Sequence, residues 1–277
     1  MAARKRQSPS TKDLQKSVKA TRTHALHPHA TGGRLAGKTA VVTGASRGIG
    51  LATACALAAE SCRVIMTGRD PRTLAEAAKK VAGCFQSGSM QSRYRVRPEV
   101  CDVRDPDSVN ELFALVRDTC GQLDVLVNNA GISQPMTPTE ETSIELWRDM
   151  IDTNLTGTFL CSKAAVPLMP RGASIVNVLS VAAKVAFPNF SAYNSSKFGA
   201  LGLTLTLREE MKQRGIRVTA LMPGATDTAI WQQISADAPR NRMIDEKTVA
   251  HMIVETVLLS PIANMSEMLF EPILGPL

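Results

Sequence analysis

Aromatic side chains make up only 4% of this 277-residue sequence, although 44% of its residues are hydrophobic. A chain of this length can bury one sizeable core or two small ones. Ala, Val, Leu and Ile are abundant, and they suit helices packed on a sheet better than a β-sandwich. The composition therefore favours an α/β fold.

The sequence also lacks the patterns of a metal-binding, secreted or membrane-spanning chain. Its six cysteines form no CxxC pair and no metal-ligand spacing, so most are expected to be small buried hydrophobes in a reducing compartment. No apolar run approaches the roughly 18 residues of a membrane span, and the N-terminus has no apolar signal-peptide core. We therefore expect a soluble cytoplasmic protein with no metal and no membrane partner.

Excess positive charge is absent from most of the chain, despite a formal net charge of +7. Residues 1–38 hold nine Lys or Arg and one acid, Asp13, whereas the remainder holds 23 Lys or Arg against 24 Asp or Glu. The folded part is thus close to neutral and offers no basic surface for nucleic acid. We expect no nucleic-acid partner.

Residues 1–34 are rich in Lys, Arg, Ser, Thr and His and show no sustained apolar periodicity. This composition predicts a basic, disordered N-terminal arm. Two alternatives stay open, because an Arg-rich segment poor in acids is also typical of an organelle transit peptide, and residues 4–6 resemble a fragment of a basic address signal. We expect residues 35–277 to form a single domain.

A strand, a glycine-rich turn and a helix follow one another where this domain begins. Residues 39–43 are apolar or β-branched, as in a strand buried on both faces of a parallel sheet. Glycines at positions 44, 48 and 50 allow a tight turn and a close backbone approach, and residues 51–60 are expected to form the helix. The free N–H groups and dipole at such a helix start attract a phosphate, so the turn predicts a nucleotide site.

The end of the second predicted strand, residues 63–67, indicates which dinucleotide would bind. A site that prefers NAD carries a carboxylate about twenty residues past the glycine turn, where it accepts from the ribose 2′-OH. Gly68 takes that place here, with Arg69 beside it and Arg47 inside the turn. Two guanidinium groups favour a 2′-phosphate, hence NADPH over NADH. Asp70 is a nearby carboxylate, but before a proline it is as typical of a helix cap.

The rest of the chain alternates between predicted strands and helices. Helices are expected at residues 72–82, 106–119, 144–168, 193–213 and 245–259, and strands at 94–101, 124–127, 174–178, 215–221 and 268–270. This alternation predicts a Rossmann-type, doubly wound parallel sheet between two helical layers. Asp102 follows one strand directly, where it can accept from an adenine amino group or simply stabilise a turn.

Tyr193 and Lys197 are four residues apart at the start of a predicted helix. That spacing places both side chains on one face, with their Cβ atoms about 5–6 Å apart. An ammonium beside a phenol lowers the phenol pKa from about 10 toward the pH at which it exchanges a proton with a substrate. On its own, however, such a pair is more often a solvated helix start.

Three motifs in this order resemble those of the classical short-chain dehydrogenases/reductases. They are TGASRGIG at residues 43–50, NNAG at 128–131 and YNSSK at 193–197, and the resemblance extends from about residue 38 to 272. It implies one parallel sheet with three helices on each face, in which Asn128 braces neighbouring strands. It further implies an NADP(H)-dependent oxidoreductase that assembles as a homodimer or homotetramer.

The resemblance also implies a catalytic set and a cofactor site. Tyr193 would donate the proton to a carbonyl oxygen that Ser180 also binds, while NADPH supplies the hydride. Lys197 would hold the nicotinamide ribose, and Asn154 would join a water-linked proton path, although a mid-helix asparagine is otherwise an exposed polar residue. The implied cofactor contacts are Gly44, Ser46, Arg47, Gly48, Ile49, Gly50, Arg69, Asp102, Val103, Asn129, Ala130, Gly131, Tyr193, Lys197, Pro223, Gly224, Thr226 and Thr228.

The resemblance implies, in addition, that residues 226–244 form a substrate lid. The pocket walls are expected to include Ser133, Met136, Val181, Ala182, Phe187, Phe190, Ala225, Ile230, Trp231 and Ile234. These mostly apolar walls, with no carboxylate clamp, favour a hydrophobic or neutral ketone or aldehyde. The alternatives are a 3-oxoacyl-[acyl-carrier-protein] reductase, an alcohol dehydrogenase for a steroid-like or polyol ligand, and a catalytically silent nucleotide-sensing protein on the same fold.

Overall fold

The computed structural model describes residues 33–85, 95–235 and 237–275. The predicted N-terminal arm therefore lies outside the described residues, apart from its last two positions. So does Tyr94, with which the third strand was expected to begin. No helix in these three ranges is long and apolar enough to cross a membrane.

A seven-stranded sheet forms the centre of the described domain, and all of its neighbouring strands are parallel. Its order is β3-β2-β1-β4-β5-β6-β9. The strands are β1 (Thr39–Val42), β2 (Arg63–Gly68), β3 (Val96–Val100), β4 (Val125–Asn128), β5 (Ser174–Val178), β6 (Arg217–Pro223) and β9 (Glu267–Phe270). The strand order reverses direction between β1 and β4, and such a switch point leaves a crevice outside the carboxyl ends of the strands.

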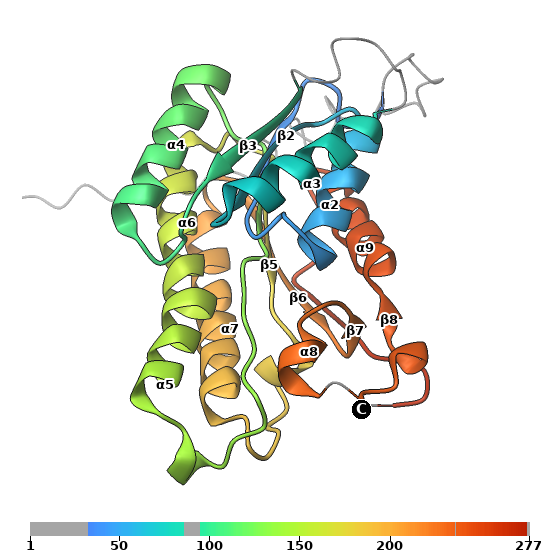
Figure 1. Cartoon of the computed structure of the whole chain (residues 1–277). Coiled ribbons are helices and arrows are strands. Elements are labelled where there is room, and N and C mark those ends of the chain that lie inside the picture. The colour runs from blue at the N-terminus through green and yellow to red at the C-terminus, as the bar shows by residue number, and fades with distance from the viewer. Residues whose placement is uncertain (1–32, 86–94, 236, 276–277) are drawn as a thin grey trace, which may run out of the picture. The chain divides into compact units, whose positions relative to one another are not determined.

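Helices cover both faces of this sheet (Figure 1). One layer holds α2 (Gly48–Ala59), α3 (Pro71–Gly83) and α9 (Glu246–Leu258), and the other holds α4 (Pro106–Cys120), α5 (Ile144–Ile151), α6 (Gly157–Ala165) and α7 (Ser191–Met211). Alternate residues of β1 serve the two layers, since Val42 packs in the core under α2 and Val41 in the core under α4. The doubly wound α/β/α fold predicted from the sequence is confirmed.

The long helix predicted at residues 144–168 is interrupted. A π-helical turn, Asp152–Thr156, separates α5 from α6, and a 3-10 turn, Val166–Leu168, ends the segment. Gly157 follows the π turn because a Cβ there would stand 2.7 Å from Cγ2 of Val103. Apolar periodicity alone does not reveal a single extra residue in a helical turn, and π turns are frequent at functional sites.

The predicted lid, residues 226–244, begins and ends in a second, two-stranded sheet. Its strands are β7 (Thr226–Asp227) and β8 (Ile244–Asp245), and the sequence between them contains the short helix α8 (Trp231–Ile234). Trp231 donates from Nε1 to the carbonyl oxygen of Thr226 at 2.9 Å, and Arg240 pairs with Asp227. These contacts hold the described part of the segment against β7.

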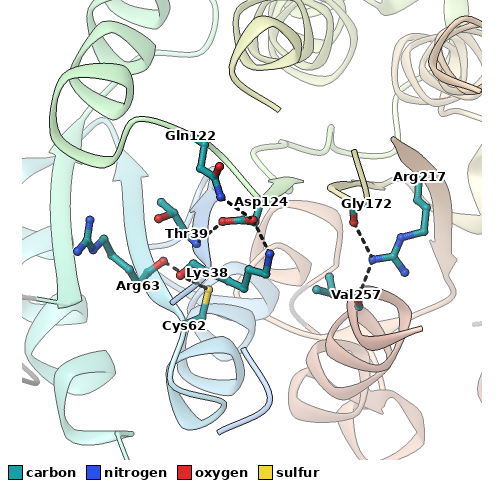
Figure 2. Close-up of polar contacts among 9 residues, drawn as sticks. All are labelled: Lys38, Thr39, Cys62, Arg63, Gln122, Asp124, Gly172, Arg217 and Val257. Carbon is teal, nitrogen blue, oxygen red and sulfur yellow. Dashed lines mark hydrogen bonds and ion pairs between the residues drawn. The ribbon is translucent and has the colours of Figure 1, made fainter. Parts of the chain in front are cut away.

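The amino ends of the strands carry a buried polar network at the edge away from the crevice (Figure 2). Asp124 is 5% exposed and accepts from Lys38 Nζ at 2.9 Å and from the backbone N–H of Thr39 at 3.0 Å. Arg217 donates to the backbone oxygens of Val257 at 2.8 Å and Leu259 at 2.9 Å. These contacts fix β1, β4 and the end of α9 without occupying the carboxyl edge.

Candidate active site

A cavity of about 630 Å³ lies along the carboxyl ends of the strands and extends from the glycine turn to the lid. Every residue expected to contact a cofactor lines it except Gly50, which is buried behind the turn. All ten expected wall residues line it too, as do Ser180, Tyr193 and Lys197. Asn154 does not line this cavity and is buried beside it at 2% exposure. Residues far apart in the sequence are thus brought to one site.

The glycine turn is tied to the exit of β4. Gly44 has a φ of +62°, and a Cβ there would stand 2.8 Å from Cα of Ala130. Asn129 donates from Nδ2 to the carbonyl oxygens of Thr43 at 3.0 Å and Gly44 at 3.1 Å. A Cβ on Gly50 would stand 2.3 Å from the oxygen of Gly44. The turn is therefore a cradle that only glycines permit, in front of a helix N-terminus, and it fits a pyrophosphate.

The adenosine end of the cavity carries the two predicted arginines. Arg47 and Arg69 both line it and are exposed. Asp70 accepts from the backbone N–H of Thr73 at 2.7 Å and caps α3, so this carboxylate is engaged as a helix cap. The described wall thus presents two guanidinium groups, one in the glycine turn and one just after β2.

Asp102 lies two residues after β3, and its carboxylate is paired with the side chain of Arg104. The guanidinium donates to both carboxylate oxygens, at 3.0 Å from Nε and 2.7 Å from Nη2, and the Arg104 backbone N–H donates at 3.0 Å. These bonds lower the pKa of the Asp102 carboxyl below its usual value. The turn role considered for Asp102 is observed, and its contact with an adenine stays a prediction.

Ser180, Tyr193 and Lys197 meet at the opposite end of the cavity. The Lys197 ammonium lies 5.7 Å from the centre of the Tyr193 ring, and the Ser180 hydroxyl is close enough to the Tyr193 phenol to lower its pKa. Ser180 Oγ also accepts from the backbone N–H of Ala182 at 3.1 Å, which fixes its rotamer. This is a hydroxyl pair beside a buried cation, an arrangement that can bind a carbonyl oxygen and transfer a proton to it.

The direction of the Tyr193 pKa shift differs from the sequence-based expectation. Burial raises the pKa of the phenol, and the neighbouring Ser180 hydroxyl only partly opposes that rise. Burial also lowers the pKa of Lys197 to about 8. The helical spacing predicted the proximity of the two groups, but it could not show that loss of water would outweigh their attraction.

Asn154 is part of the framework behind this site. Its Oδ1 accepts from the backbone N–H of Ile132 at 2.9 Å, and its Nδ2 donates to the oxygen of Ile132 and to Ser196 Oγ, both at 3.0 Å. The alternative of an exposed mid-helix asparagine is therefore wrong. The π turn directs this amide at the loop that follows β4 and at α7.

Two residues that follow β9 line the cavity without having been predicted to do so. Glu271 and Pro272 line it, although neither was among the expected cofactor contacts or pocket walls. Their position directly after β9 was the available signal, since the carboxyl ends of parallel strands share one edge. Asp237, in the predicted lid, also lines the cavity and is exposed, as is Glu271. The substrate end is thus apolar inside and acidic at its rim.

Comparison with known proteins identifies relatives of this arrangement. The family model for short chain dehydrogenases matches residues 38–239. A 3beta-hydroxysteroid dehydrogenase from Mediterraneibacter gnavus is 38% identical over 206 residues, covering 74% of this chain and 72% of that protein. A 3-oxoacyl-[acyl-carrier-protein] reductase from Synechocystis sp. is 37% identical over 207 residues, covering 73% and 80% of the two chains.

Solved structures share the fold, and two of them hold NADP or a derivative of it. A metagenomic short-chain oxidoreductase in complex with NADP superimposes with a TM-score of 0.73 at 28% identity, covering 87% of this chain and 99% of the other. An alcohol dehydrogenase from the archaeon Thermococcus sibiricus, complexed with 5-hydroxy-NADP, gives 0.77 at 28% identity over 86% and 97%. The cradle, the cavity and these likenesses support a nicotinamide cofactor. The chain belongs to the oxidoreductases of the classical short-chain dehydrogenase/reductase family.

Proposed function

We propose that the protein is an NADPH-dependent reductase of a hydrophobic or neutral ketone or aldehyde, or the dehydrogenase of the corresponding alcohol. The observation that carries the proposal is the meeting of Ser180, Tyr193 and Lys197 in one cavity with the glycine cradle. A silent nucleotide sensor would have no need of this hydroxyl pair beside a buried cation.

The chain's own residues bind, orient and protonate the substrate. A bound nicotinamide supplies the hydride. Ser180 and Tyr193 hold the carbonyl oxygen, and Tyr193 gives up its proton as negative charge develops there. Lys197, with a pKa of about 8, is charged at neutral pH and stabilises the phenolate that remains. Asn154 binds the backbone of Ile132 and the side chain of Ser196, and so supports the loop and the helix that carry these residues. We propose that it also joins a water-linked proton path to Lys197.

NADPH is the proposed cofactor because, in the part of the chain that the structure describes, two arginines face the adenosine end and the nearby Asp102 carboxylate is paired with Arg104. Arg47 and Arg69 line the cavity, and Asp70 is engaged as a helix cap. The names of two structural neighbours refer to NADP or its derivative, which agrees with this choice. The remaining cofactor contacts proposed above line the same cavity, except Gly50, which lies behind the turn.

The substrate end favours a neutral carbonyl compound over an acyl chain on an acidic carrier. The rim carries Asp237 and Glu271, both exposed, and like charges at a docking edge oppose binding. A 3-oxoacyl-[acyl-carrier-protein] reductase therefore stays the second candidate, on the ground of the Synechocystis relative. The apolar walls and the steroid dehydrogenase relative support a hydrophobic substrate.

Self-association and location complete the proposal. Trp147, Phe159 and Phe198 are exposed apolar side chains on α5, α6 and α7, and they support a homodimer or homotetramer formed through these helices.

All six cysteines are free, which supports a reducing compartment such as the cytoplasm.

The test is NADPH oxidation with a panel of ketones and aldehydes. Tyr193→Phe should bind NADPH nearly normally but lose carbonyl reduction by several powers of ten, whereas Ser195→Ala, an exposed change on the same helix turn, should leave both unchanged. Near-normal turnover of Tyr193→Phe would exclude the assignment. Intact NADPH binding with no turnover on any carbonyl would favour the sensor.

A further inference from the structure

Gln134 lies in the loop that follows β4, and its side chain is completely buried, at 0% exposure. The side-chain amide contacts the backbone at the start of α7. Its Oε1 accepts from the backbone N–H of Tyr193 at 2.8 Å, and its Nε2 donates to the backbone oxygen of Asn189 at 3.2 Å. The two backbone partners lie 55 and 59 residues away in the sequence. Burying an amide costs free energy unless its donor and its acceptor are both paired, and here both are.

The first turn of α7 has no cap of its own. Phe190 occupies the N-cap position and offers no side-chain hydrogen bond. The leading N–H groups of a helix need an acceptor, and a side-chain oxygen normally serves the second or third of them. Tyr193 is the third residue of α7, so Gln134 supplies that cap from a distant loop.

The turn before α7 is held by the same loop. Asn189 has a φ of +64°, a conformation that asparagine adopts more readily than most residues. Its carbonyl oxygen accepts from Gln134 and also from the backbone N–H of Thr137 at 2.9 Å. The loop therefore fixes both the entry to the helix and its third residue.

The backbone of Tyr193 is also fixed from its carbonyl side. Ser196 Oγ donates to the oxygen of Tyr193 at 2.7 Å and accepts from Asn154, whose amide holds the backbone of Ile132. Ile132 and Gln134 belong to one loop, so that loop holds the N–H of Tyr193 directly and its carbonyl group through two side chains. Rotation or sliding of the first turn would break one of these contacts.

We propose that Gln134 is a positioning residue, which caps α7 and thereby sets the place of the Tyr193 hydroxyl relative to Ser180. The inference rests on the proposed function, because it assigns Gln134 through the proton donor. The role requires a group that accepts and donates at once. An uncharged amide does so, whereas a methionine side chain of similar length cannot donate and accepts only weakly. Misplacing a reacting group by about 1 Å can cost about a hundredfold in rate.

The same contact couples the tyrosine to the substrate wall. Ser133 and Met136 flank Gln134 in the loop and line the cavity, whereas Gln134 itself does not. A change at Gln134 should therefore act on proton transfer and on the adjoining wall, but not on the cradle that holds the cofactor. This predicts a fall in kcat with nearly unchanged binding of NADPH.

The experiment compares Gln134→Met and Gln134→Glu with the unmodified protein. Gln134→Met should lower kcat by about 10- to 100-fold and leave the Kd for NADPH within about twofold. Hydrogen–deuterium exchange should become faster at the Tyr193 amide, a readout that needs no turnover. Gln122→Met is the matched control, because it removes an amide that donates to Asp124 at the other edge of the sheet. It should leave kcat and exchange at Tyr193 unchanged.

Gln134→Glu tests the hydrogen-bond requirement itself. A protonated glutamic acid can accept from Tyr193 and donate to Asn189, whereas the carboxylate can only accept. The kcat of this variant, relative to the unmodified protein, should therefore recover as the pH falls. A pH-independent ratio would overturn the proposal, and this variant decides the matter if Gln134→Met fails to fold.

The outcomes separate this inference from the proposed function. Near-normal turnover of Tyr193→Phe would remove the proposed function, whatever Gln134 does. If Tyr193→Phe is inactive but folded Gln134→Met retains full kcat and unchanged exchange at Tyr193, the positioning role of Gln134 is wrong and the proposed function stands.

Discussion

The Lys197 ammonium lies 5.7 Å from the centre of the Tyr193 ring and donates to the backbone oxygen of Val178 at 3.3 Å. Lys197 is only 6% exposed, so the end of β5 holds a buried cation beside the phenol. One side chain thus links the sheet edge to α7. Its protonation state should govern both cofactor binding and proton transfer.

Binding of NADPH should weaken as the pH rises through about 8. Burial lowers the Lys197 pKa to about 8, so the ammonium loses its proton near that pH. Between about 8 and the unfolded value near 10.4, the unfolded chain holds this proton and the folded chain does not, so this group's contribution to stability rises with pH. The Kd for NADPH, measured from pH 7 to 9.5, checks the prediction.

Lys197→Met provides the control for that titration. The variant should bind NADPH weakly at every pH and show no break near pH 8. A wild-type Kd that stays constant across the range would show that the charge of Lys197 does not hold the cofactor.

Arg47→Ala and Arg69→Ala should each raise the KM for NADPH by about 10- to 100-fold, while the KM for NADH changes little. A hydrogen bond to a charged group contributes about 1.5–3 kcal/mol, which corresponds to that range. Both arginines line the adenosine end and are exposed, so the effect should shrink at high salt. Arg72→Ala, at an exposed arginine that does not line the cavity, is the matched control. Equal efficiency of NADPH and NADH in the unmodified protein would contradict the prediction.

Gly50→Ala should abolish or strongly weaken NADPH binding. Its Cβ would stand 2.3 Å from the oxygen of Gly44 and 2.4 Å from Nδ2 of Asn129, so the turn must open. We expect a loss of about 1–3 kcal/mol in the free energy of unfolding, typical of overpacking. Gly83→Ala, where nothing lies within 4 Å, should be neutral or slightly stabilising. Thermal unfolding and fluorescence titration measure both effects, and normal binding by Gly50→Ala would refute the cradle.

Arg217→Met should destabilise the fold by about 1–3 kcal/mol and leave kcat unchanged. Its guanidinium donates to the backbone oxygens of Thr256, Val257 and Leu259 at the end of α9, and Figure 2 shows the bond to Val257. Unpaired buried acceptors are costly. The site lies at the amino ends of the strands, away from the cavity. Arg214→Met, which removes an exposed arginine bonded to Val166, should cost about 0.5 kcal/mol or less. Denaturant unfolding distinguishes the two, and equal losses would contradict the capping role.

Local patterns were sufficient for most of the fold. The strand predicted at 174–178 is β5 residue for residue, and the helix predicted at 106–119 differs from α4 by one residue at its end. Such segments are predictable from local sequence. An apolar run between turn residues indicates a buried strand, and an amphipathic stretch that begins with a capping residue and a proline indicates a helix. The π turn at Asp152–Thr156 was not predictable, because its reason lies in contacts with Ile132 and Val103.

The sequence by itself determined the alternation of strands and helices, the glycine turn and the spacing of Tyr193 and Lys197, since each depends on residues close together in the chain. Only the tertiary structure decided how Gln134 reaches Tyr193 and that burial raises the phenol pKa. Both depend on segments that meet only after folding and on the water they exclude. Local spacing carries information about neither.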